Sequence, residues 1–242
     1  MILCFEFSCA NDGSVLAFFL DFWAKKSALK YSITAQNRSI KLYVEGNENE
    51  LAKFSDEYIN LVPHSIFIEE SKVSLADELP KNSEFEFDFS FKNITPNALK
   101  SDENEFGFKS DNIFIANAIK DIMAGKTVNY DGYEISKFSS FDCDYILPTN
   151  LKNAAKIFVC DEKSLIALAS FEKPVINLRT NAIYRSNHKD APLYFDVRSA
   201  WDINVYKITQ ALSENGINFL SIKSSKDDMK VSILDERILI IR

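Results

Sequence analysis

The first 70 residues alternate between strand-like and helix-like hydrophobic patterns. Residues 2–7 alternate apolar and polar positions, which predicts a strand. Residues 15–27 then carry apolar side chains at helical spacing, which predicts an amphipathic helix with one buried face. The series continues with strands at 30–35 and 39–44, a helix at 48–60 and a strand at 65–69. The predicted order is therefore strand, helix, strand, strand, helix, strand.

A Phe-rich segment follows a polar stretch at residues 71–83 that we expect to be a linker. From Glu84 to Phe91, four Phe alternate with three acids and a serine, so the two kinds of side chain point to opposite faces of a strand. This alternation favours an antiparallel strand with one solvated face. The sequence leaves open whether the Phe face packs within its own domain or recruits a partner strand.

The rest of the chain mixes helical and strand patterns. Residues 92–112 are polar and contain Pro96 and Gly107, so we place a domain boundary at their start. Helices are predicted at 111–124, 163–170 and 203–216, and strands at 144–147, 154–159, 174–178, 194–197, 219–222, 230–234 and 237–241. Residues 128–135 are predicted as a strand or as a hairpin around Asp131-Gly132. The predicted fold class is α+β: a ferredoxin-like βαββαβ domain over residues 1–92, with the Phe-rich segment as an extra strand, followed by a mixed α/β domain over residues 93–242.

Charge and cysteine content disfavour several classes of protein. The net charge of −7 repels phosphate backbones, so we expect no nucleic-acid partner. No apolar run approaches the roughly 20 residues of a membrane-spanning helix, and the first residues lack a secretory signal pattern. The four cysteines include no C-x-x-C pair, which disfavours zinc ribbons and thioredoxin-type sites. We therefore expect a cytoplasmic protein without a bound metal or cofactor.

The loop after the first strand reads Cys9-Ala10-Asn11-Asp12-Gly13-Ser14-Val15-Leu16-Ala17. Together with the element order and the phrase Tyr43-Val44-Glu45-Gly46, this loop resembles the acylphosphatase family, whose domain also stands at the front of HypF-type hydrogenase maturation proteins. In that family the loop is written V-Q-G-V-G-F-R and its Arg binds phosphate, while an Asn orients the attacking water. Only Gly13 of the present loop matches the family pattern.

Both catalytic positions that the resemblance implies are occupied by alanine. Ala17 stands at the Arg position and Ala35 at the Asn position. Alanine has no donor for an oxyanion, so we predict no catalytic residue in this domain and hence a pseudo-enzyme. Asn37 could replace the missing Asn only if the register of the hairpin shifted, which the buried face of the strand opposes.

Further resemblances extend into the second half of the chain. Residues 118–126 and the phrase from Phe171 to Arg179 are similar to YrdC-like nucleotide-binding domains, which lie further along HypF-type proteins. The cysteine pairs of the HypF zinc fingers are missing, and His64 and His188 are too separated to form the His pair of the last HypF domain. The chain therefore resembles a degenerate HypF-type or HydE-type hydrogenase maturation accessory protein. That resemblance implies a protein partner, such as a hydrogenase subunit or another maturation factor.

Four residues of the second half are candidate binding residues. Arg179 and Arg185 follow a predicted strand and could hold a carboxylate or a phosphate. Trp201 and Arg198 are of the residue types that dominate interface hot spots, although core packing also explains Trp201. No group of residues has the spacing of a metal site, so we predict no metal ligand.

Two hypotheses about function remain. The first is a non-catalytic accessory protein that acts in assembly or maturation of a nickel–iron hydrogenase through protein–protein binding. The alternative is a nucleotide- or acyl-phosphate-binding enzyme that uses the C-terminal domain. A binding protein should expose a large apolar or aromatic patch, whereas an enzyme should contain a concave pocket with converging polar groups.

Overall fold

A computed structural model describes residues 1–85, 92–99, 106–234 and 237–241. The chain divides into two compact units, which we call unit 1 (Met1–Phe91 with Thr95–Lys100) and unit 2 (Lys92–Ile94 with Ser101–Arg242). The short segment at 92–94 belongs to unit 2 because the N–H of Ile94 donates to the carbonyl of Trp201 at 2.9 Å. The domain limits expected from the sequence, 1–92 and 93–242, remain a proposal about independent folding.

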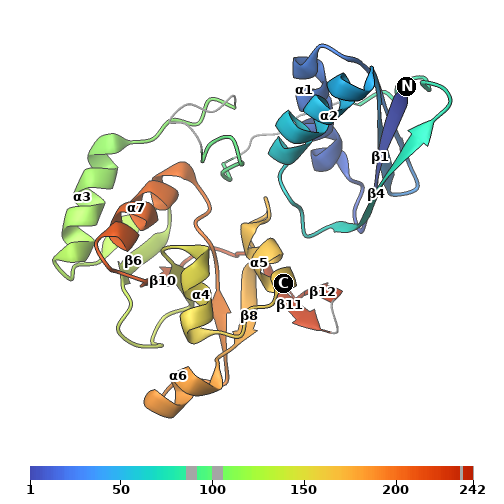
Figure 1. Ribbon diagram of the computed structural model, residues 1–242. Helices are drawn as coiled ribbons and strands as arrows, with labels where there is room; N and C mark the ends of the chain where they lie inside the picture. The colour runs from blue at the N-terminus through green and yellow to red at the C-terminus, as the bar shows by residue number, and fades with distance from the viewer. Residues whose placement is uncertain (86–91, 100–105, 235–236, 242) are drawn as a thin grey trace. The chain divides into compact units, whose positions relative to one another are not determined.

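Unit 1 is a four-stranded antiparallel sheet with helices on one face (Figure 1). Its elements are β1 (Ile2–Cys9), α1 (Ser14–Ser27), β2 (Lys30–Gln36), β3 (Ser39–Glu45), α2 (Glu48–Glu57), the short 3₁₀ turn η1 (Ile59–Leu61) and β4 (Ile68–Ala76). The strand order β2-β3-β1-β4 is that of a ferredoxin-like βαββαβ fold. This confirms the predicted α+β class and the acylphosphatase-like arrangement.

The core of unit 1 lies between the sheet and the two helices. Leu16 and Leu20 of α1 and Phe54 of α2 pack against alternate side chains of the strands. The rings of Phe5 and Phe54 lie 5.9 Å apart, which joins the central strand to the second helix. Asn47 accepts from the backbone N–H of Glu50, whose own carboxylate accepts in return from the N–H of Asn47, and this capping box fixes the start of α2.

The last strand of unit 1 corrects the prediction. A strand was predicted at 65–69 and a linker at 71–83, whereas β4 begins at Ile68 and continues to Ala76. This strand lies at the edge of the sheet and exposes most of its side chains, so its sequence lacks the apolar alternation that marks a half-buried strand. After β4, Ser83 bonds to the edge of β2, where its N–H donates to the carbonyl of Ile33 at 2.8 Å.

The Phe-rich strand predicted at 84–91 lies largely outside the described residues. Phe85, which the structure does describe, is half-buried against the core of unit 1.

Unit 2 is a mixed eight-stranded sheet with five helices among its described residues (Figure 1). The strand order is β12-β11-β8-β9-β7-β10-β6-β5, in which β8 and β11, and β7 and β9, are parallel neighbours. The strands are β5 (Val128–Tyr130), β6 (Tyr133–Lys137), β7 (Tyr145–Pro148), β8 (Val175–Arg179), β9 (Tyr194–Val197), β10 (Phe219–Ser224), β11 (Lys230–Leu234) and β12 (Arg237–Ile240). The helices are α3 (Asn112–Met123), α4 (Leu151–Ile157), α5 (Glu162–Ala169), α6 (Ala182–Asn187) and α7 (Ile203–Glu214).

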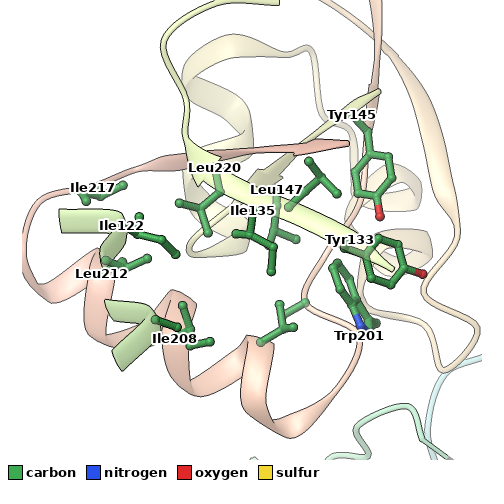
Figure 2. Packing of buried hydrophobic residues seen from close by; sticks show 14 of the residues in the cluster. Ile122, Tyr133, Ile135, Tyr145, Leu147, Trp201, Ile208, Leu212, Ile217 and Leu220 are labelled. Atoms are coloured by element: carbon green, nitrogen blue, oxygen red, sulfur yellow. The ribbon is translucent and has the colours of Figure 1, made fainter. Parts of the chain in front are cut away.

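The main core of unit 2 forms where α3 and α7 pack on the sheet. Figure 2 shows Ile122 of α3 near Ile208 and Leu212 of α7, with Leu147 and Leu220 of the strands beside them. The other face of the sheet is also covered, because α4 contacts β7 and α5 contacts β8. All four residues of β7 are therefore buried, as expected of a strand with both faces covered.

One local prediction in unit 2 is wrong, and one helix was not predicted. A strand was predicted at 154–159, but residues 151–157 form α4, because the side chain of Asn150 caps a helix by accepting from the N–H of Lys152. The helix α6 was not predicted at all. It spans six residues with no buried side chain, so it leaves no hydrophobic periodicity in the sequence.

Candidate functional site

The loop after β1 and the turn between β2 and β3 meet at one end of unit 1. The N–H of Cys9 donates to the carbonyl of Arg38 at 2.8 Å, which ties the two segments together. A cavity of about 450 Å³ lies between them. Its lining residues are Asn11, Asp12, Ala35, Gln36, Asn37, Arg38 and Ile40. The loop that the acylphosphatase resemblance singled out therefore borders the cavity.

The two alanines at the implied catalytic positions offer no polar group here. Ala17 is fully buried in the core of unit 1, and its backbone N–H is already bonded to the carbonyl of Gly13 at 2.9 Å. Ala35 lines the cavity with a methyl group only. Asn37 does not replace it, because the β2–β3 register pairs Ala35 with Ile40 and leaves Asn37 in the turn.

The backbone donors of the loop are used by the loop itself. The N–H of Gly13 donates to the side chain of Asn11 at 3.0 Å, and that of Ser14 donates to the carboxylate of Asp12 at 3.1 Å. Backbone N–H groups at a helix start are the usual anion-binding groups of such a loop. Here two of them are satisfied internally, and the Asp12 carboxylate adds a negative charge that repels an anion.

A glycine at position 13 is required for a reason that does not involve a ligand. Its φ of 69° lies in the left-handed region, and a Cβ at this position would lie 2.8 Å from Cγ1 of Ile40. The close approach of the loop to β3 therefore demands glycine. The single residue that matches the family's loop pattern is explained by the local backbone alone.

Arg38 is the cation of this cavity. It occupies the β2–β3 turn with a φ of 64° and is exposed. Its guanidinium makes no ion pair within the described residues, so it could contact an anion in the cavity. Sequence reasoning missed Arg38 because the residue comes from the hairpin turn and not from the loop in which the family places its Arg.

The structure places two predicted partner-binding residues in the interior of unit 2. Arg198 is 8% exposed and Trp201 is 5% exposed, and the guanidinium carbon of Arg198 lies 4.7 Å from the centre of the Trp201 ring. Core packing accounts for this position of Trp201 (Figure 2). A role for either residue at an interface stays a prediction.

Arg198 is the centre of a buried polar network. Its Nη1 donates to the carboxylate of Asp228 at 2.8 Å and to the hydroxyls of Tyr133 at 3.0 Å and Tyr145 at 3.2 Å. Its Nε donates to the carbonyl of Lys173 at 2.8 Å. These partners come from separate strands and loops, so no local spacing in the sequence could have identified the network.

Burial controls the ionisation of the groups around this network. Burial raises the pKa of Tyr133 to about 12, although the charge of Arg198 opposes the rise. Burial lowers the pKa of Lys173 to about 8, and its ammonium donates to the carbonyl of Ala169 at 3.0 Å. The tyrosines therefore stay protonated near neutral pH, where the network serves as a structural element.

The two predicted anion-binding residues lie on the surface of unit 2. Arg179 ends β8 and pairs in the sheet with Tyr194 of β9, while Arg185 lies in the last turn of α6. Both are exposed, and neither makes an ion pair in the part of the chain that the structure describes. The structure does not bring their guanidinium groups together in any contact among the described residues.

An aromatic cluster joins residues of α6 and β9 to Phe138 and Phe141, and sequence reasoning missed it. Phe141 is its centre, with ring centroids 5.0 Å from Phe195, 5.3 Å from Phe138 and 6.3 Å from Tyr184. His188 stacks on Tyr184 at 4.0 Å, which explains the position of this histidine without a metal or a catalytic role. We call these five residues the aromatic cluster. Each is half-buried or exposed, so the rings reach the surface.

Within residues 1–85, 92–99, 106–234 and 237–241, no group of three or more His, Cys, Asp or Glu is arranged to hold a metal ion. The four cysteines are free. No helix in those same ranges combines the length and the apolar character needed to cross a membrane.

Comparison with known proteins identifies the fold. No protein-family model matches the chain, and no curated protein matches it. Among solved structures, HypF of T. kodakarensis matches with a TM-score of 0.57 and 10% identity, over 100% of this chain and 49% of that one. A full-length HypF in a phosphate- and nucleotide-bound form matches with a TM-score of 0.47 and 12% identity, over 100% of this chain and 50% of that one.

An acylphosphatase from Bacillus subtilis covers 35% of the chain, and its own whole length, with a TM-score of 0.27 and 20% identity. The present chain thus spans about half the length of the HypF proteins that it matches. At 10% identity the likeness to HypF concerns the fold alone. It covers the residues of both units, whose fold is HypF-like and of the α+β class.

Proposed function

We propose that this protein is a non-catalytic accessory factor that acts in the cytoplasm in maturation or assembly of a nickel–iron hydrogenase, by binding a protein partner. The observation that carries the proposal is the altered loop of unit 1 within a HypF-like fold. Ala17 and Ala35 remove the expected donors, and Asn11 and Asp12 occupy the backbone N–H groups of the loop. In this view unit 1 is a degenerate acylphosphatase-like domain and unit 2 a degenerate YrdC-like domain, each kept as a scaffold.

The aromatic cluster supports a binding role. Aromatic and arginine side chains dominate interface hot spots, and here the exposed Arg185 follows Tyr184 of the aromatic cluster directly in α6. Ile183, next to Tyr184 in α6, is also exposed. Aromatic side chains at the surface are enriched in protein interfaces.

Affinity capture from the protein's own host tests the proposal. The tagged wild-type chain should recover hydrogenase subunits or maturation factors, identified by mass spectrometry. The variant Arg185→Glu with Tyr184→Ala should lose them, because it removes a cation from α6 and a ring from the aromatic cluster. Lys53→Glu, on the exposed side of α2, is the matched control and should recover the same proteins as wild type.

Two results would contradict the proposal. One is capture that recovers no protein related to a hydrogenase. The other is unchanged hydrogenase activity in a host that lacks this protein, measured as hydrogen-dependent dye reduction in cell extracts. Loss of that activity on deletion, restored by the wild-type chain, is the expected result.

The alternative, a nucleotide- or acyl-phosphate-binding enzyme, rests on free guanidinium groups. Arg179 and Arg185 are exposed without ion pairs among the described residues of unit 2, and Arg38 lines the cavity of unit 1. Calorimetric titration with ATP and with acetyl phosphate separates the two locations. Binding abolished by Arg179→Ala with Arg185→Ala would favour the enzyme hypothesis, whereas binding abolished by Arg38→Ala alone would place the anion in unit 1.

A further inference from the structure

Strand β4 has a free edge. It is the outer strand of its sheet and, among the described residues, pairs with β1 alone. Every residue from Glu69 to Leu75 is exposed, and Val73 and Leu75 expose 59% and 66% of their surface. A long exposed edge with apolar side chains and no proline is a template for another strand.

The hydrogen bonds of the neighbouring strands show which backbone groups of β4 are free among the described residues. Met1 and Gly46 exchange N–H···O bonds of 2.9 and 3.0 Å, and the N–H of Cys9 donates to the carbonyl of Arg38 at 2.8 Å. Odd-numbered residues of β1 therefore bond to β3, and even-numbered residues bond to β4. The even residues of β4 from Glu70 onward bond to β1, so the outward N–H and C=O groups belong to Ser71, Val73 and Leu75, while Glu69 lies at a shift in the β1–β4 register.

A row of alternating charges ends at this edge. On the face of the sheet away from the helices, Glu6 lies opposite Lys41 on one side and Lys72 on the other. The two ammonium groups lie 3.3 and 3.1 Å from the Glu6 carboxylate. Across the strands the charges are positive at Lys41, negative at Glu6 and positive at Lys72, and Lys72 lies on the edge strand β4. The next position, on any added strand, favours a carboxylate.

A second copy of the chain supplies that carboxylate. We propose that β4 pairs antiparallel with β4 of a second copy, about a two-fold axis at Ser71. In this register Glu70 of each copy lies opposite Lys72 of the other, which continues the alternating row in both directions. Ser71 pairs with its own copy on the axis, and Val73 pairs with Glu69 at the register shift of β4, which gives up to about six backbone hydrogen bonds across the axis. An isologous contact of this kind closes as a dimer and leaves no new edge.

Neighbouring registers are less complementary in charge. With Lys72 on the axis, the two lysines would lie directly opposite each other and repel. With Val73 on the axis, Lys72 would face Ser74 and the carboxylate position of the row would stay empty. Both alternatives keep side chains on the correct faces, so charge is what selects the Ser71 axis. The dimer goes beyond the proposed accessory role, because it rests on unit 1 alone and not on the aromatic cluster.

Sedimentation equilibrium of the full chain tests the dimer. Wild type should be a dimer at low salt and dissociate as salt rises, since exposed charge pairs are screened. Glu70→Lys should weaken the dimer by about tenfold or more in Kd, because each added lysine faces Lys72. Adding Lys72→Glu to that variant should restore association. A monomer at all soluble concentrations, or equal dimerisation of the single-charge variant, would overturn the proposal.

Cross-linking tests the register separately. Ser71→Cys places two thiols on the axis, where paired Cα atoms about 5.5 Å apart permit a disulfide. Mild oxidation should link this variant and should not link Val73→Cys or wild type, whose own free cysteines provide the background. Linkage through Val73→Cys would overturn the proposed axis. Circular dichroism should show that each exposed-site variant keeps the wild-type fold.

Discussion

The carboxylate of Asp228 lies 2.8 Å from the guanidinium of Arg198, and the two side chains are only 10% and 9% exposed. The pair brings together β11's preceding loop and the residue after β9, and Tyr133 adds a hydroxyl that donates to the same carboxylate at 2.7 Å. Every polar atom of such a pair needs a partner, because a buried charge left alone is costly. The network therefore links the loop before β11 and the residue after β9 to strands β6 and β7.

Removing one partner of this pair should destabilise unit 2 strongly. We expect Arg198→Leu to lower the free energy of unfolding by about 3–5 kcal/mol, because Asp228 would remain buried without its cation. Arg198→Leu with Asp228→Leu should lose less than the two single changes added together. Each unit contains one tryptophan, so urea unfolding in a Trp23→Phe background reports on unit 2 through Trp201.

The matched control for this prediction is the exposed pair of Lys53 and Glu57, 3.7 Å apart on α2. Lys53→Ala should change stability by less than about 0.5 kcal/mol. An effect of Arg198→Leu as small as that of the control would show that water reaches the network.

Because of Lys173, the free energy of unfolding of unit 2 should rise between pH 8 and 10. Burial lowers the pKa of Lys173 to about 8, whereas the unfolded chain keeps a value near 10.5. Below pH 8 both states are protonated, and the folded state carries the cost of a buried charge. Between pH 8 and 10 the folded state releases its proton first, so stability increases. Above pH 10 the buried tyrosines, whose pKa burial raises, reverse the trend.

Lys173→Met tests this assignment. The variant should be more stable than wild type at pH 7, by about 1–3 kcal/mol, and should lack the rise between pH 8 and 10. The measurement is the urea-unfolding free energy at several pH values in this window. A slope that survives the substitution would assign the rise to other groups.

Restoring the implied catalytic residues should not restore an acylphosphatase. Ala17 is fully buried, so Ala17→Arg would place a guanidinium in the core of unit 1 and destabilise it by roughly 3 kcal/mol or more. Ala35→Asn faces the cavity and should cost less than about 1 kcal/mol. We expect neither variant, nor the two combined, to hydrolyse benzoyl phosphate above the rate in buffer. Measurable turnover by the combined variant would show that the loop still binds phosphate despite Asp12.

Hydrophobic patterning predicted most of the fold because most elements bury one face. The helix periodicity of Leu16 and Leu20 and the strand alternation of Phe5 and Phe7 each required packing on one side, and the structure supplies it. The edge strand β4 and the short helix α6 bury almost nothing, so the same reasoning had no signal there. These two omissions fell where tertiary packing does not constrain the side chains, whereas the wrong strand at 154–159 fell on the short buried helix α4, whose apolar run also fits a strand.

The candidate site divides in the same way. The loop from Cys9 to Ala17 could be compared with the acylphosphatase pattern from the sequence alone, because its residues are contiguous. The contribution of Arg38 could not, since it depends on how the β2–β3 turn meets that loop. The burial of Arg198 depends likewise on Asp228, thirty residues further along the chain. Long-range pairing of polar groups leaves no periodic trace.

Among the residues of the loop from Cys9 to Ala17, Gly13 should lose the most stability on substitution. Gly13→Ala both strains a φ of 69° and places a Cβ 2.8 Å from Cγ1 of Ile40, so we expect a loss of about 2–4 kcal/mol in the stability of unit 1. Gly125 has a similar φ of 78° but open space around its Cβ position, and Gly125→Ala should cost only about 1 kcal/mol. Urea unfolding followed through Trp23 or Trp201 measures each in its own unit. Equal losses of stability in Gly13→Ala and Gly125→Ala would mean that the loop moves away from β3 freely. Gly13 would then not be required by this close approach.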